Sequence, residues 1–295
     1  METVAFYSYK GGVGRSLLLT NAAKFLAQHG KGVVALDLDF EAPGLHYKLG
    51  VDQGPGSPTF AGGAVPYLIA TAQGAASPPP LIDHMIAMVH DADARGWLWL
   101  MPSGPAPDKT YWAAFKKLGD TIRLGDPSGQ GLMALLDLQA RIADELKPDY
   151  LLIDARTGVT ELGGLATTLL ADTVVCMFVA NQESFDGTLA VIEALESAPR
   201  LAGQRPIRVV SVLSRLNVPG TRVVDVLKKS IRRSSHTEVA FYVLPHENLH
   251  VSEKLGTSSP LYKAYLEIFK GLFPSATELG QNAPPRRKTK PHKNL

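Results

Sequence analysis

A glycine-rich stretch near the N-terminus constrains this chain more than any other feature. It reads Lys-Gly-Gly-Val-Gly-Arg-Ser and begins at Lys10. The ordinary phosphate loop has a Gly, four residues of any kind and then Gly-Lys-Ser/Thr. Alignment on Gly14 and Ser16 places Tyr9 at the first Gly of that pattern and Arg15 at its Lys. The stretch therefore keeps the glycines of a phosphate loop and departs from the pattern at two positions.

The flanking residues place this loop between a strand and a helix. An apolar run over residues 4–7 is typical of a buried strand, and apolar residues recur at helical spacing from Ser16 to His29. Gly30 and Gly32 then end the helical pattern. The first N–H groups of a helix have no partner within it, and its dipole favours an anion. The sequence predicts a phosphate-binding turn, closed by glycines that lack a Cβ, with the Ser16 hydroxyl available to Mg²⁺.

Two other interpretations of the glycines are weaker. A dinucleotide-binding turn would begin at Gly12 and would use an acid roughly 20 residues later at the end of the next strand. However, the third glycine position of that turn is Leu17, and Lys10 and Ser16 have no role in it. A tight turn without a ligand would also be glycine-rich. We favour the phosphate loop, because it accounts for all of these residues.

A second segment ends a buried strand in two acids. Residues 33–44 read Val-Val-Ala-Leu-Asp-Leu-Asp-Phe-Glu-Ala-Pro-Gly, so Asp37 and Asp39 are two positions apart and share one face of the strand. The carboxyl ends of parallel strands converge on the ligand crevice. We therefore expect both acids near the phosphate loop, one orienting Mg²⁺-bound water and the other the attacking water. The alternative is a pair of exposed acids at a strand end.

A third segment, residues 150–158, reads Tyr-Leu-Leu-Ile-Asp-Ala-Arg-Thr-Gly. A hydrophobic strand that ends in an acid such as Asp154 is the Walker B arrangement, in which the carboxylate holds Mg²⁺ directly or through water. Gly158 would give the following loop a hinge for sensing the γ-phosphate. Arg156 would either act on the charge of the transition state or pair with a nearby acid, and we favour the pairing.

Taken in this order, the three segments resemble the deviant Walker A P-loop ATPases of the ParA/MinD superfamily, in the SIMIBI class. Arg15 and the segments Glu-Ala-Pro-Gly and Asp-Ala-Arg-Thr-Gly are similar to a bacterial branch with a KGGVGR motif. The likeness extends to segments 97–104, 174–182, 209–217 and 241–247. It implies an α/β fold over residues 1–275, a doubly wound, mostly parallel central sheet with helices on both faces.

The resemblance also implies roles for individual residues. Lys10 matches the signature lysine, which reaches across a nucleotide-sandwich homodimer to the partner's phosphates. Arg15 occupies the position of the lysine at the β- and γ-phosphates, and Asp39 matches the acid that positions the attacking water. The Mg²⁺ ligands that we expect are Ser16, Asp37, Asp39 and Asp154. The residues expected around ATP are Lys10, Gly11, Gly12, Val13, Gly14, Arg15, Ser16, Leu17, Asn217 and Pro245.

The implied activity is that of an ATPase switch that dimerises with ATP and relaxes after hydrolysis. A planar guanidinium is not a conservative replacement for an ammonium at a phosphate, so Arg15 predicts slow hydrolysis. Two uses of the switch stay open. One is regulation of a protein partner, such as an effector in a bacterial defence or stress locus. The other is DNA partitioning, through non-specific contacts of the tail and of Lys228, Lys229, Arg232 and Arg233 on a helix over 222–234.

Composition is consistent with one globular domain, at 45% hydrophobic and 20% charged residues in a chain of 295. Cys176 is the one cysteine, which excludes an intrachain disulfide and fits a cytoplasmic protein. One cysteine is too few to ligate an iron–sulfur cluster unless a dimer shares more. No apolar stretch approaches 18 residues and no signal peptide is evident, so we expect no membrane association. We expect residues 276–295 to form a disordered basic tail. Residues 51–80 are expected to form a loop with one helix near 65–71, without an assigned role.

Overall fold

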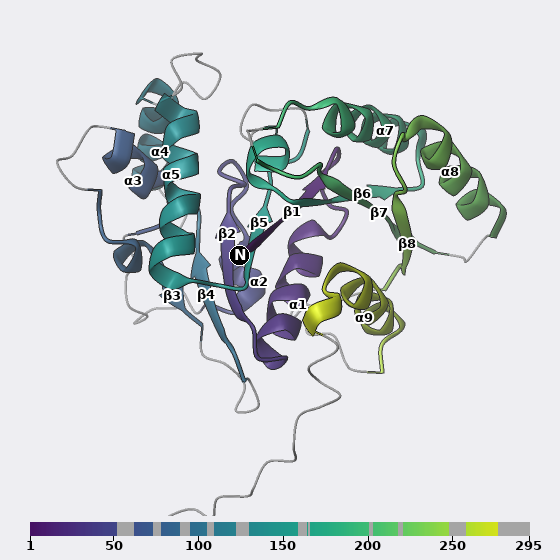
Figure 1. Ribbon diagram of the computed structural model, residues 1–295, viewed down its shortest axis with the longest axis horizontal. Helices are drawn as coiled ribbons and strands as arrows, with labels where there is room; N and C mark the ends of the chain where they lie inside the picture. The colour runs from purple at the N-terminus through teal and green to yellow at the C-terminus, as the bar shows by residue number, and fades with distance from the viewer. Residues whose placement is uncertain are drawn as a thin grey trace, which may run out of the picture.

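An eight-stranded sheet runs through the centre of the described residues (Figure 1). The structure is a computed structural model, and it describes residues 1–51, 62–72, 78–88, 95–104, 109–121, 130–158, 164, 166–200, 203–217, 221–247 and 258–276. The strands lie in the order β3-β4-β2-β5-β1-β6-β7-β8. They are β1 (Glu2–Ser8), β2 (Gly32–Asp37), β3 (Ile86–Ala87), β4 (Trp97–Met101), β5 (Tyr150–Asp154), β6 (Thr173–Val179), β7 (Arg208–Leu216) and β8 (Ala240–Pro245).

The pairings in this sheet are parallel, except that the short β3 runs antiparallel to β4 at one edge. Parallel strands covered on both faces carry nearly continuous apolar runs, because both sides of each strand are buried. β2 shows this pattern, since all its residues are buried. The doubly wound, mostly parallel sheet predicted from the sequence is confirmed.

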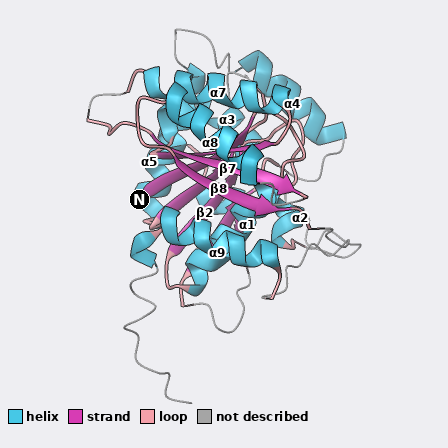
Figure 2. Cartoon of the chain, turned by 90° about the vertical axis from the view of Figure 1, so that its right-hand side faces the viewer, coloured by secondary structure: helices cyan, strands magenta, loops and turns pink. Residues whose placement is uncertain are grey.

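Helices cover both faces of the sheet (Figure 2). One layer holds α1, α2 and α9, and the other holds α3, α4, α5, α7 and α8. The α-helices are α1 (Arg15–Gln28), α2 (Leu45–Leu49), α3 (Ala64–Ala72), α4 (Lys109–Thr121), α5 (Gln130–Arg141), α7 (Gln182–Ser197), α8 (Thr221–Ser234) and α9 (Pro260–Leu272). A 3₁₀ turn, η1 (Leu81–His84), and two π-helical turns, η2 (Ile142–Leu146) and η3 (Ala166–Leu170), complete the described elements.

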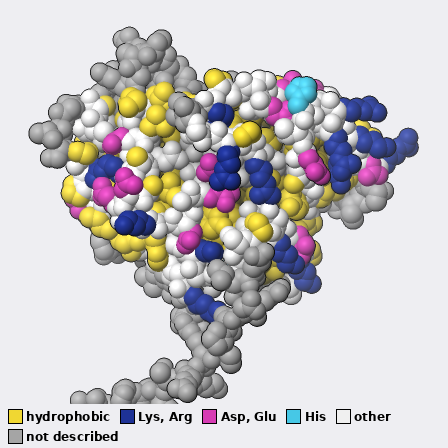
Figure 3. Space-filling model, in the orientation of Figure 1, with side chains coloured by type: hydrophobic (Ala, Val, Ile, Leu, Met, Phe, Trp, Pro, Cys, Tyr) yellow, Lys and Arg dark blue, Asp and Glu magenta, His cyan; other side chains and the backbone are white. Residues whose placement is uncertain are grey.

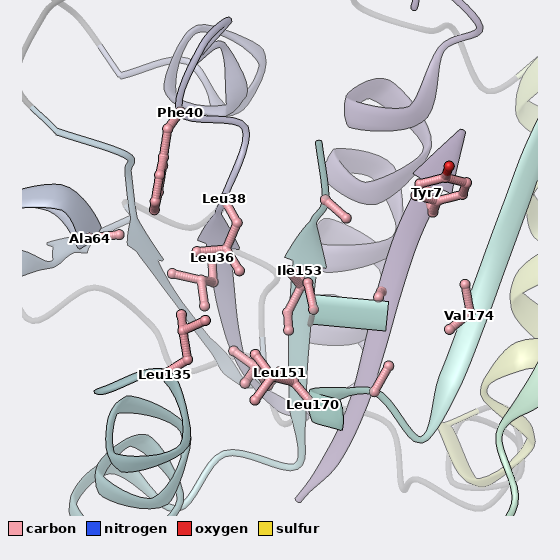
Figure 4. Close-up of a cluster of buried hydrophobic side chains, with 14 of the residues drawn as sticks. Tyr7, Leu36, Leu38, Phe40, Ala64, Leu135, Leu151, Ile153, Leu170 and Val174 are labelled. Atoms are coloured by element: carbon pink, nitrogen blue, oxygen red, sulfur yellow. The ribbon is translucent and has the colours of Figure 1, made fainter. Parts of the chain in front are cut away.

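The central strand β1 contributes to a separate apolar core on each face. Val4 and Phe6 belong to the cluster packed against α1 and α9, whereas Ala5 and Tyr7 belong to the cluster packed against α3, α5 and α7. Figure 4 shows part of the second cluster. Because alternate residues of a strand point to opposite faces, one apolar run serves both cores and fixes the strand at the centre of the sheet.

Most predicted elements lie within one or two residues of the observed ones. α1 begins at Arg15, one residue before the prediction, and α3 covers the helix predicted near residues 65–71. Within α9, Leu266 is only partly buried, whereas Ile268 is fully buried. Residues 52–61, 73–77 and 277–295 lie outside the described residues, so the prediction for the tail is not tested.

Cys176 lies within β6 and is fully buried. Burial raises the pKa of its thiol to about 12, which suits a packing role rather than a reactive one. None of the helices in the described part of the chain has both the length and the apolar character needed to span a bilayer.

Candidate nucleotide-binding site

The glycine loop connects the end of β1 to the start of α1. Gly12 and Gly14 have left-handed backbones, with φ of +74° and +95°, a conformation that glycine adopts without steric cost. At Gly11 and Gly14, no heavy atom lies within 4 Å of an added Cβ. Within the described residues, no side chain caps α1, and its first turn holds no acid. The loop and the α1 N-terminus therefore present backbone N–H groups beside open space, as an anion-binding turn requires.

The end of β7 holds this loop in place. The Ser214 hydroxyl donates a hydrogen bond to the Val13 carbonyl (2.8 Å), and the Arg215 guanidinium donates one to the Gly12 carbonyl (2.9 Å). Arg215 has a left-handed backbone, with φ of +56°, at a point where the register of β7 with β8 shifts. Such irregularities re-aim side chains near functional sites. Neither Ser214 nor Arg215 was predicted as a site residue; the signal in the sequence was a polar pair at the end of an apolar strand.

A cavity of about 690 Å³ lies over the loop, within the range typical of ligand sites. The predicted residues Gly11, Gly12, Val13, Gly14, Arg15, Ser16, Leu17, Asp39 and Pro245 line it. Further lining residues include Glu41, Lys48, Arg156, Ser214, Arg215, Leu244, His246, Glu247, Leu261 and Tyr265. Asn217 is exposed beyond β7 and is not among the lining residues, so its place beside the nucleotide stays a prediction. Lys10 is also outside the lining, and its ammonium pairs with Glu183 at the start of α7.

Arg15 is buried at the base of the cavity, with 7% of its side chain exposed. Its Nε donates to Asp154 Oδ1 (2.5 Å) and its Nη2 donates to Asp39 Oδ2 (2.6 Å). Its Nη1 lies 3.5 Å from the Ser8 hydroxyl. The structure therefore brings together Asp39 and Asp154, the acids predicted to orient water and to hold Mg²⁺, and one guanidinium joins them.

Asp37 and Asp154 occupy matching positions at the ends of the neighbouring strands β2 and β5. Asp37 is fully buried, and its carboxylate accepts hydrogen bonds from the backbone N–H groups of Asp39 (3.0 Å), Gly44 (3.3 Å) and Leu45 (3.2 Å). Burial, reinforced by the charge of Asp154, raises the pKa of Asp37 to about 7. Asp37 thus fixes the conformation of the segment that follows β2. Its carboxylate binds backbone N–H groups, and Asp37 is not among the residues that line the cavity.

Asp39 lies on that segment and lines the cavity. Burial raises the pKa of its carboxyl, and the neighbouring charge of Arg15 opposes the rise. The contact with Arg15 Nη2 therefore fixes the Asp39 carboxyl group at the position where an acid is expected to orient water.

A second arginine joins the segments that follow β2 and β5. The Arg156 guanidinium pairs with the Glu41 carboxylate; the Arg156 side chain is partly exposed and that of Glu41 is exposed. This is the pairing favoured in the sequence analysis. Gly158, two residues later, has a left-handed backbone with φ of +76°, and its carbonyl accepts a hydrogen bond from the Tyr7 hydroxyl (3.2 Å). Gly158 thus adopts a backbone conformation that favours glycine, and its role as a hinge stays a prediction.

The residues predicted to hold Mg²⁺ offer hard oxygen ligands, namely the hydroxyl of Ser16 and the carboxylates of Asp37, Asp39 and Asp154. Within the described residues, no three His, Cys, Asp or Glu side chains form a group that would hold a metal ion unaided. Asp39 and Asp154 are bound by Arg15, and Asp37 by backbone amides. The donor chemistry fits Mg²⁺ as part of a metal–nucleotide complex, in which phosphate oxygens supply ligands, rather than a site built by protein alone.

Comparison with solved structures finds the same fold in several nucleotide-binding proteins. The septum site-determining protein MinD from Pyrococcus horikoshii, complexed with Mg-ADP, is 17% identical with a TM-score of 0.63, over 94% of this chain and 98% of that one. Cobyrinic acid a,c-diamide synthase from Mycobacterium smegmatis, with bound ADP and magnesium, is 17% identical with a TM-score of 0.63, over 97% and 99%. The MinC:MinD cell division complex from Aquifex aeolicus gives 20% and 0.57, over 97% and 99%.

Among curated proteins, none matches this chain in sequence. The structural likenesses above are below 25% identity, so they establish the fold. The family assignment comes from a family model, described as the CobQ/CobB/MinD/ParA nucleotide binding domain, which matches residues 4–254. That range contains the loop, the cavity-lining acids and the end of β7. The chain belongs to the CobQ/CobB/MinD/ParA nucleotide-binding domain family.

Proposed function

We propose that this chain binds Mg-ATP in the cavity over the glycine loop and hydrolyses it slowly, as a nucleotide-dependent switch. The observation that carries the proposal is the cavity itself, in which the open glycine loop faces the same space as Arg15 and Asp39. Family membership supports nucleotide binding, and two proteins of the same fold hold ADP and magnesium.

Each part of the site has a task in this proposal. The N–H groups of the loop and of the α1 N-terminus bind the phosphates, and the Arg15 charge faces them from the base of the cavity. Mg²⁺, when bound, neutralises phosphate charge; Ser16 and Asp154 are the residues that would hold it. Asp39 orients the attacking water. Pro245 and the apolar residues near it border the space for the base, and the absence of Asn-Lys-x-Asp over residues 214–217 favours ATP over GTP.

We further propose that ATP drives formation of a homodimer through Lys10. This ammonium is 42% exposed and pairs with Glu183 at the surface rather than with the cavity. An exposed pair of this kind contributes little free energy, typically about 0–1 kcal/mol. Lys10 is therefore held weakly enough to leave Glu183 for the phosphates of a second copy.

The oligomeric state with and without a non-hydrolysable ATP analogue tests this proposal. Light scattering should show a dimer for the wild type only when the analogue and Mg²⁺ are present, and a monomer for Lys10→Ala in both conditions. Lys270→Ala, which breaks an exposed pair on α9, should dimerise like the wild type. A monomer under every condition would contradict the dimer, and failure to bind the analogue would contradict the whole proposal.

The partner of the switch is proposed to be a protein, and the surface of α8 favours DNA as a second candidate. Arg222, Lys229, Arg232 and Arg233 of α8 are exposed and Lys228 is partly exposed. In Figure 3, dark blue side chains gather over this helix. A cationic face of this kind binds phosphates without regard to sequence and with strong salt dependence.

A mobility-shift assay on arbitrary duplex DNA separates the two candidates. If DNA is the partner, binding should require ATP, weaken steeply with salt and disappear in Lys229→Glu/Arg233→Glu. The matched variant Lys116→Glu/Lys263→Glu changes two exposed cations on α4 and α9 and should bind as the wild type does. Indifference to DNA in every state would leave the protein-partner candidate.

A further inference from the structure

Arg15 stands where the ordinary loop has a lysine, and its contacts differ from those of a phosphate ligand. Two of its nitrogens each bind a different carboxylate, Nε that of Asp154 (2.5 Å) and Nη2 that of Asp39 (2.6 Å). The side chain is 7% exposed, and the Asp154 side chain only 2%. Hydrogen bonds between ionised groups are about twice as strong as neutral ones. Arg15 is therefore anchored mainly to protein acids.

The two acids lie on separate parts of the chain. Asp154 ends β5, whereas Asp39 follows β2 on a segment whose backbone is held by Asp37. Asp37 lies beside Asp154, at the matching position of the neighbouring strand β2. Three carboxyl groups thus crowd one edge of the sheet, and Arg15 is the cation bound to two of them. Without that cation, repulsion would push Asp39 and its segment away from Asp154.

We propose that Arg15 is a positioning residue that sets the distance and orientation of Asp39 and Asp154, and that lysine cannot replace it. The proposal rests on the proposed function, in which these acids orient water and hold the metal. A guanidinium presents donors along two edges of a rigid plane, whereas an ammonium offers all its donors from one nitrogen on a flexible stem. Only the former reproduces simultaneous contacts from Nε and Nη2.

This assignment makes the substitution toward the ordinary loop harmful. In Arg15→Lys, the charge facing the phosphates persists, so ATP affinity without Mg²⁺ should stay within about threefold of the wild type. The positioning of the acids is lost, so kcat should fall by about tenfold or more while KM changes little. The thermal midpoint of the nucleotide-free protein should fall by about 5 °C. A purely structural role would lower the midpoint and leave kcat unchanged.

Arg15→Lys with the activity and thermal midpoint of the wild type would overturn the proposal. So would a loss of Mg²⁺-free ATP affinity as large as the loss of kcat, because Arg15 would then act as a phosphate ligand alone. Lys270→Ala breaks the exposed Lys270–Glu267 pair and is the control, with no expected change in any readout.

A double-mutant cycle on the nucleotide-free protein tests the same contact without any ligand. Arg15→Gln and Asp39→Asn should each lower the thermal midpoint, and the double variant should lose less than the sum of the two. Additive losses would show that Arg15 and Asp39 do not interact. If the wild type bound no ATP, the proposed function would fail while this cycle still decided the Arg15–Asp39 contact. If Arg15→Gln did not fold, the cycle with Arg15→Lys would replace it.

Discussion

At the scale of single residues, the Asp37 carboxyl group organises the backbone after β2 while it is fully shielded from solvent. Its carboxyl is fully buried, and three backbone N–H groups donate to it, which ties the segment after β2 to the end of that strand. Burial and the nearby Asp154 raise its pKa to about 7. Its usual value is near 3.8, so the folded protein holds a proton that the unfolded chain has released across this interval.

The sign of the resulting pH dependence follows from linkage. Between about pH 4 and 7 the folded state binds more protons than the unfolded state at Asp37, so its contribution to stability falls as pH rises. Relative to Asp37→Asn, the wild type should lose up to about 1.4 kcal/mol of unfolding free energy per pH unit in this window. Urea denaturation of both proteins at pH 5 and pH 7 measures the difference. Parallel changes in the two proteins would contradict the raised pKa.

The site acids were predictable because each ends an apolar strand or follows one within two residues. Asp37, Asp39 and Asp154 therefore came from local pattern and from the rule that parallel strands converge at their carboxyl ends. The partners of Arg15 and the contact of Arg215 with Gly12 were not predictable in this way. These contacts join residues 139, 24 and 203 positions apart, and only the packed sheet brings them together.

At the scale of elements, α7 explains the residue that replaces the first glycine of the ordinary loop. A Cβ on Gly187 of α7 would lie 2.3–2.5 Å from ring atoms of Tyr9, so the Tyr9 ring packs directly on the backbone of this helix. The loop is thereby held on one side by α7 and on the other by the end of β7. Tyr9 therefore makes a packing contact with α7 at the position where the ordinary phosphate loop has its first glycine.

Gly187→Ala tests this contact. The methyl group should displace the Tyr9 ring and lower the free energy of unfolding by about 1–3 kcal/mol, although alanine favours helix by about 1 kcal/mol. Gly119→Ala in α4 is the matched control, because nothing lies within 4 Å of its Cβ, and it should be neutral or stabilising. Urea denaturation checks both. In a Tyr9→Ala background, Gly187→Ala should no longer destabilise; a persistent loss would contradict the contact.

Secondary-structure elements were predicted correctly where the periodic pattern of apolar residues extended over enough positions. The strands β1, β2 and β5 and the helix α1 each carry enough apolar residues to define their period. The edge strand β3 has two residues, too few for a period, and its antiparallel pairing depends on β4. The irregular end of β7 is likewise set by contacts with the loop rather than by its own sequence.

At the scale of the whole molecule, the fold brings five strand ends to one cavity. The ends of β1, β2, β5, β7 and β8 supply the residues that line or border it, namely the loop, Asp39, the Arg156 segment, the Ser214–Arg215 pair, and Leu244 with Pro245. Two arginines join the segments at the ends of β2 and β5. Arg15 binds Asp39 and Asp154 in a buried contact, and Arg156 binds Glu41 nearer the surface. Binding at this cavity would therefore act on both segments together, as a nucleotide switch requires.

Calorimetric titration of Mg-ATP tests nucleotide binding at this cavity most directly. Gly11 lines the cavity, and an added Cβ there meets no heavy atom within 4 Å, so Gly11→Ala should fold normally and intrude only on a bound phosphate. The wild type and Gly119→Ala should bind one ATP per chain with equal affinity, and Gly11→Ala should bind at least about tenfold more weakly. Absence of binding by the wild type, or equal affinity in Gly11→Ala, would contradict the account.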